Sequence, residues 1–114
     1  MPHRDWSIRI EDILEACRRI VEYVSDMDEQ IFAEDQRTVD AVVRNLAVIG
    51  EAANHLPEDL IAKSPGIPWA EMRGIRNVVV HEYFGISMPI IWKTVKDDIP
   101  PLIPLLQDIL DSQE

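Results

Sequence analysis

Apolar residues recur every three or four positions along most of the chain, which is the spacing of amphipathic helices. Two long stripes of this kind predict helices over about residues 6–25 and 36–56, with Asp5 as the cap of the first. The residues between them, 27–35, are mostly acidic and indicate a solvated linker. The first half of the chain is therefore predicted to form two long helices, each with one buried face.

Prolines and glycines divide the second half of the chain. One helical turn is expected at 58–62, and the segment 65–68 then breaks the chain. A third helix is predicted to start near residue 68 and to end at Gly85, and a fourth to start after Ser87. The last helix should be kinked or split near Pro100-Pro101. The pattern predicts an all-α fold, a single antiparallel four-helix bundle over residues 1–114.

Composition supports one folded domain of 114 residues, because 46% of them are hydrophobic. The single cysteine, Cys17, falls on an apolar stripe and is expected in the core, where it is no catalytic nucleophile. One cysteine cannot form an internal disulfide, which fits a reducing cytoplasm. We expect neither a secretory signal at the start of the chain nor a membrane-spanning helix.

The charge is strongly negative, with 21 acidic against 11 basic residues and a formal net charge of −10. A protein that coats nucleic acid would be basic, so this class is excluded. An enzyme that contacts only a few phosphates through a local basic cleft remains compatible with the composition.

The predicted third helix separates polar from apolar side chains. The apolar arc, which should face the core, consists of Met72, Ile75, Val78 and Val79. The opposite side carries Arg73, Arg76, Asn77 and His81, and Tyr83 lies two turns from Arg76 along the same edge. Val80 and Phe84 interrupt this polar side. Apolar residues among charges on an outer face suggest contact with a second protein surface.

The chain lacks a glycine-rich phosphate loop, a CxxC pair and an HExxH motif, and its three histidines are too scattered to predict a zinc site. Arg76, Asn77, His81 and Tyr83 remain as candidate chemistry. Metal-free RNA cleavage needs a base, an acid and cations at the phosphate, and histidine and arginine supply these groups. One protomer offers one suitable histidine. A two-fold dimer would bring two copies of His81 and Arg76 into one cleft.

Each of these residues also has an ordinary structural interpretation. His81 is near the end of the predicted helix, where the helix dipole favours an imidazolium. Tyr83 is compatible with a place in the core, and Arg73 and Arg76 with a solvated surface. Taken alone, the spacing leaves both interpretations open.

The stretch from Arg76 to Tyr83, RNVVVHEY, resembles the Arg-x4-His-x-Tyr signature of HEPN-domain proteins. More closely, the chain resembles the HepT toxins of HepT–MntA toxin–antitoxin pairs. The likeness extends to RNLAVIGEAANHLPEDL (44–60) and to PWAEMRGIRNVVVHEYFGISMPIIWKTVKDDIP (68–100). The first helix agrees with the family in pattern rather than in distinctive residues.

The resemblance implies a type VII-like toxin, a helical homodimer that cleaves RNA as a metal-independent endoribonuclease and needs no cofactor. It implies that Arg76 and His81 pair across the dimer and that Asn77 belongs to the catalytic site. Arg73, on the same side, is assigned a supporting RNA contact. The implied partner is an MntA-type nucleotidyltransferase antitoxin, which transfers AMP from ATP to Tyr83.

Two other functions stay open at this point. HEPN relatives include non-catalytic modules that bind nucleotides or proteins, and such a module could partner the same nucleotidyltransferase. A purely structural helical protein is the third possibility.

Overall fold

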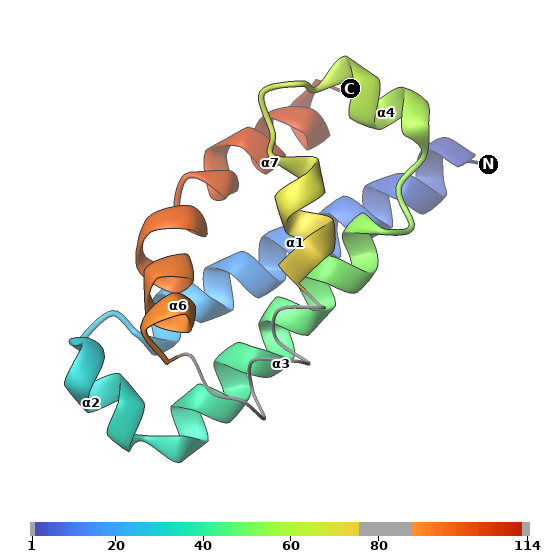
Figure 1. Cartoon of the computed structure of the whole chain (residues 1–114). Helices are drawn as coiled ribbons and strands as arrows, with labels where there is room; N and C mark the ends of the chain where they lie inside the picture. The colour runs from blue at the N-terminus through green and yellow to red at the C-terminus, as the bar shows by residue number, and fades with distance from the viewer. Residues whose placement is uncertain (1, 76–87, 113–114) are drawn as a thin grey trace.

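The protein is all-α in the residues that the structure, a computed structural model, describes, which are 2–75 and 88–112 (Figure 1). Its elements are α1 (Pro2–Tyr23), α2 (Glu29–Glu34), α3 (Gln36–Ala53), α4 (Glu58–Lys63), α6 (Met88–Lys93), the π-helix η1 (Thr94–Asp98) and α7 (Leu102–Asp111). Residues 69–75 are also helical. The predicted all-α class is confirmed, and the arrangement is consistent with a HEPN-like helical bundle.

The two long helices form the centre of the molecule. α1 and α3 run in opposite directions and pack against each other, and α7 packs against α1 from the other side (Figure 1). The predicted stripes supply the core, because most of their side chains are buried. These are Ile10, Ile13, Leu14, Cys17, Ile20 and Val24 in α1, and Val39, Val42, Leu46, Ile49 and Ala53 in α3. Helical periodicity thus predicted the buried faces of both long helices correctly.

The prediction of a linker over residues 27–35 is wrong, because α2 lies there. The Asp28 side chain caps the helix by accepting a hydrogen bond from the Ile31 amide at 2.8 Å. Phe32 is fully buried, and its ring lies 5.2 Å from that of Trp92 in α6. Asp28, Glu29 and Glu34 are exposed to solvent, while one aromatic side chain fixes the stretch to the core.

Two predicted helix ends also need correction. α1 begins at Pro2, so Asp5 lies inside the helix instead of capping it. α3 ends at Ala53 rather than near residue 56, because the Asn54 side chain donates to the Gly50 carbonyl at 3.0 Å. The Asn54 amide donates to the same carbonyl at 3.1 Å, so the backbone and the side chain of Asn54 together cap the last turn. The helical turn predicted at 58–62 is confirmed as α4.

The last helix is split at the predicted prolines, but a π-helix precedes the break. In η1 the Ile99 amide donates to the Thr94 carbonyl at 3.0 Å, five residues back. Val95 and Ile99 are both buried. α7 starts directly after Pro101, since a proline at a helix start needs no amide donor.

Candidate functional site

The helical segment 69–75 leads into the predicted catalytic motif, and it is fixed to the core at its start. Trp69 is buried, and its indole nitrogen donates to the Ser64 carbonyl at 2.9 Å. Met72 is buried and Ile75 packs against the core from a partly buried position. The apolar arc of the predicted third helix therefore faces the core as far as Ile75, and the helix starts where the sequence predicts.

Arg73 is the one predicted site residue that the structure describes. Its Nε donates to the Ala53 carbonyl at 3.3 Å, and its Nη2 lies 3.2 Å from Glu58 Oε2. The side chain is only 28% exposed, whereas that of Glu58 is 83% exposed. Arg73 thus joins the end of α3 to the start of α4 and to segment 69–75. These contacts give it a bracing role, and its RNA contact stays a prediction.

The other predicted site residues, Arg76, Asn77, His81 and Tyr83, lie outside the described residues. The same holds for the predicted Gly85 and Ser87 caps and for the outer apolar residues Val80 and Phe84. The flanking chain is placed on both sides: Ile75 and Met88 each pack against the hydrophobic core. The described residues on either side of segment 76–87 are therefore packed against the core.

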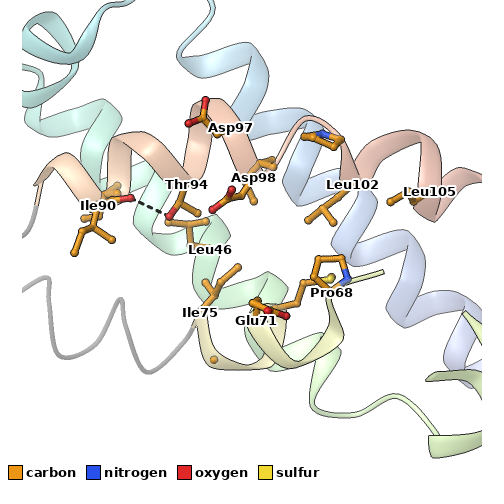
Figure 2. A pocket seen from close by; sticks show the side chains of 15 residues that line it. Leu46, Pro68, Glu71, Ile75, Ile90, Thr94, Asp97, Asp98, Leu102 and Leu105 are labelled. Carbon is orange, nitrogen blue, oxygen red and sulfur yellow. Dashed lines mark hydrogen bonds between the residues drawn. The ribbon is translucent and has the colours of Figure 1, made fainter. Parts of the chain in front are cut away.

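A groove of about 600 Å³ lies between segment 69–75 and the α6–η1–α7 segment (Figure 2). Most of its lining side chains are apolar. They include Leu46, Met72, Ile75, Ile90, Ile91, Ile99, Leu102 and Leu105. Glu71 lines one side, and Asp97 and Asp98 line the other, with the Asp98 carboxylate directed toward the groove in Figure 2. We call this hollow the acid-rimmed groove; its surface suits an apolar ligand rather than a phosphate.

A second hollow, of about 440 Å³, lies between α1 and α3 and has a polar lining. It contains Arg19 and Arg44 together with Asp12 and Glu15. Arg19 is paired with Glu15 at 3.2 Å, and both side chains are more than half exposed. Because cations and anions balance here, the hollow forms no basic cleft that would select a phosphate.

Cys17 is fully buried in α1, as predicted, and burial raises the pKa of its thiol to about 12. Desolvation is the cause, because an apolar environment disfavours the thiolate. The thiolate is the nucleophilic form of cysteine, so Cys17 is not a catalytic nucleophile. The described residues contain no group of three or more His, Cys, Asp or Glu side chains that could hold a metal ion.

We predict that Cys17 resists alkylation by iodoacetamide at about pH 8.5 in the native protein. In about 8 M urea, which exposes the thiol, it should react within minutes. Mass spectrometry of the intact chain would measure the added mass. Stability should also fall as the pH rises above about 9, because the unfolded thiol ionises there while the folded one stays protonated. Rapid native alkylation would contradict the buried position.

Sequence reasoning missed the contact that fixes α2. Trp92 lies against Phe32 on one side, and the Lys96 ammonium lies 5.4 Å from the centre of its indole ring. A usable signal was present, because Asp28 is a good cap residue and two apolar residues follow it within one turn. The stretch is too short for periodicity to reveal it.

No helix of the described ranges is both long and apolar enough to cross a bilayer. The fold is thus an all-α domain whose distinctive residues follow segment 69–75. Comparison with known proteins shows which class this is. The family model described as "Ribonuclease HepT-like" matches residues 13–109, which is most of the chain.

Individual relatives agree with this match. A protein of Methanocaldococcus jannaschii, named "Putative RNase MJ0127", is 40% identical over 114 residues, covering 100% of this chain and 94% of the relative. "Probable ribonuclease HepT" of Thermococcus cleftensis is 42% identical over 100 residues, 88% of each chain. A Caldanaerobacter subterraneus relative, also named as an RNase, is 36% identical over 105 residues, 92% of this chain and 94% of its own. No solved structure is a significant match.

The fold and these relatives define a class: small all-α domains of ribonuclease-named proteins. The chain belongs to the HepT-like ribonuclease family. The resemblance found in the sequence is therefore confirmed.

Proposed function

We propose that this protein is a metal-independent endoribonuclease that acts as a homodimer, with Arg76, His81 and Asn77 as its catalytic residues. The observation that carries the proposal is the match of a ribonuclease family over residues 13–109, in a chain that holds the Arg-x4-His-x-Tyr spacing. The described part of the chain supports it, because segment 69–75 is a helix fixed to the core immediately before Arg76.

The chemistry follows from the residue types. One imidazole takes the proton of a ribose 2′-hydroxyl, and the resulting oxygen attacks the adjacent phosphorus. A second acid protonates the leaving 5′-oxygen, so the products are a 2′,3′-cyclic phosphate and a free 5′-hydroxyl. Arg76 stabilises the charge that develops on the phosphate oxygens, and Asn77 donates a further hydrogen bond. Two protomers supply the two imidazoles, since His81 alone in each motif cannot be base and acid at once.

RNA cleavage in the presence of excess EDTA tests this proposal. Purified, unmodified protein should cut total RNA equally well with and without the chelator, leaving cyclic phosphate at the new 3′ ends. Activity lost in EDTA and restored by a divalent cation would contradict metal independence. Intact RNA under all conditions, from folded protein, would favour the alternative, a non-catalytic HEPN module that binds a nucleotide or a partner protein.

We further propose that the protein is the toxin of a type VII-like toxin–antitoxin pair in the cytoplasm. Its antitoxin is an MntA-type nucleotidyltransferase that transfers AMP from ATP to the Tyr83 hydroxyl, releasing pyrophosphate. An anionic, bulky group two residues from His81 would repel RNA phosphate and obstruct the site. Membership of the HepT-like family supports this pairing.

Tyr83→Phe should abolish AMP addition, because phenylalanine has no hydroxyl to attack the α-phosphate. The expected readout is intact-mass spectrometry after co-expression with the nucleotidyltransferase: the wild type gains one or more AMP masses and the variant gains none. Tyr23→Phe serves as the matched control, since Tyr23 is an exposed tyrosine on α1 and should leave the modification unchanged. AMP addition that persists in Tyr83→Phe would place the acceptor elsewhere.

A further inference from the structure

The surface of the acid-rimmed groove has two uncommon properties. The first is exposed apolar area: Ile90 is 49% exposed and Leu105 is 36% exposed, and both line the groove. They lie on α6 and α7 toward the two ends of the groove, and Ile75 lies on the opposite side, on segment 69–75 (Figure 2). Apolar side chains that meet in one open groove mark a binding surface more strongly than the same residues scattered singly.

The second property is the charge at the rim. Glu71 is exposed on segment 69–75, and Asp98 is exposed on η1 across the groove. Lys93 is 3.9 Å from Asp98, but both side chains are more than half exposed, so this pair is weakened by solvent. No arginine or lysine is among the described lining residues. The rim therefore keeps a negative potential over an apolar floor.

This charge selects among possible occupants. RNA is disfavoured, because its phosphates would meet carboxylates without cations to neutralise them. A second copy of the chain packed groove to groove is also disfavoured, since a two-fold contact would set Glu71 and Asp98 against the same residues of the partner. A partner with apolar side chains between lysines or arginines fits both the floor and the rim. The net charge of −10 would also speed its association.

We infer that the acid-rimmed groove binds a basic amphipathic helix of a partner protein. The apolar face of that helix packs on Ile75, Ile90 and Leu105, with anchors at helical spacing. Its flanking cations pair with Glu71 and Asp98 on opposite sides of the groove. Because the groove lies beside segment 69–75, which leads directly to Arg76, a bound helix would lie next to the predicted motif.

A designed peptide tests the inference with the full-length protein. The probe is a fluorescein-labelled helix of about 18 residues with leucine at positions i, i+3, i+4 and i+7 and lysine elsewhere. Its binding is followed by fluorescence anisotropy, beside a second peptide in which glutamate replaces every lysine. The lysine peptide should bind at least about tenfold more tightly than the glutamate peptide, because the rim is acidic.

Variants then locate the bound peptide. The single substitution Ile90→Asp should weaken binding of the lysine peptide by about tenfold or more. The double substitution of Glu71→Lys and Asp98→Lys should weaken it by a similar factor. Two matched controls should change binding by less than about twofold. One is Ile31→Asp, which alters an equally exposed isoleucine on α2, and the other is Asp108→Lys on α7. All altered positions are exposed, so circular dichroism should show an unchanged fold.

Three outcomes would overturn the inference. Equal loss with Asp108→Lys would show attraction by bulk charge alone. Equal binding of the two peptides would show that the rim selects nothing. In the third outcome, sedimentation velocity shows that Ile90→Asp dissociates a dimer of this protein, while peptide binding is unchanged. The groove would then be an interface with a second copy of the chain.

Discussion

His81→Ala should reduce RNA cleavage by about 10²–10⁴-fold, the range that loss of a general acid or base produces. Alanine leaves no group at that position to carry a proton near neutral pH. In a dimer with both imidazoles in one cleft, the substitution removes the base and the acid together, so the upper part of the range is expected. Growth arrest on expression of the gene alone should disappear with the activity. Cleavage would be measured on purified protein with a labelled RNA.

His55→Ala is the matched control for this substitution. His55 lies near the end of α3, with an exposed side chain whose Nδ1 is 2.8 Å from the Glu51 carbonyl oxygen. The control removes an imidazole and should keep wild-type cleavage and toxicity. Arg76→Ala should match His81→Ala in activity while retaining the dimer. Wild-type cleavage by both the His81 and the Arg76 variants would refute the proposed catalytic site.

Phe32→Ala should lower the free energy of unfolding by about 3–5 kcal/mol, the usual cost of truncating a buried phenylalanine. Phe32 has no exposed area, and its ring packs against Trp92, so alanine would leave a cavity between α2 and α6. Such a loss is a large part of the stability of a typical small domain. Urea unfolding followed by circular dichroism would measure it.

The neighbouring residue provides the control for Phe32→Ala. Ile31 occupies the same short helix but is 49% exposed, so Ile31→Ala should change stability by less than about 1 kcal/mol. Phe32→Leu should fall between the two, because leucine refills part of the volume. If Phe32→Ala and Ile31→Ala had equally small effects, α2 would not be fixed to the core as the structure shows.

The comparison of Phe32 with the long helices shows what the sequence could and could not predict. The two long apolar stripes, to which the buried residues Ile13 and Ile49 belong, were predicted correctly, because each runs over many turns and periodicity averages out exceptions. Phe32 lies in six helical residues surrounded by acids, too few for a period to emerge. Its burial depends on Trp92, which is distant in the chain and close only after folding.

The candidate site also combines features that the sequence predicts with features that it does not. The spacing of Arg76 and His81 is a property of the sequence, and the family match supports its assignment without describing its geometry. Arg73 could be placed on the polar side of its helix. Its hydrogen bond to the Ala53 carbonyl and its contact with Glu58 could not be predicted, since they require α3, α4 and segment 69–75 to be packed first.

The enclosed position of Cys17 makes the native protein, in effect, a thiol-free scaffold. A cysteine introduced at any exposed position would be the single group that a maleimide label or an oxidant can reach. Spin labels, fluorophores and disulfide traps can therefore be attached to exposed positions of the chain without first removing the natural cysteine. A disulfide that links two protomers through one such site would report directly which residues meet across a dimer, while the helical core stays in its wild-type form.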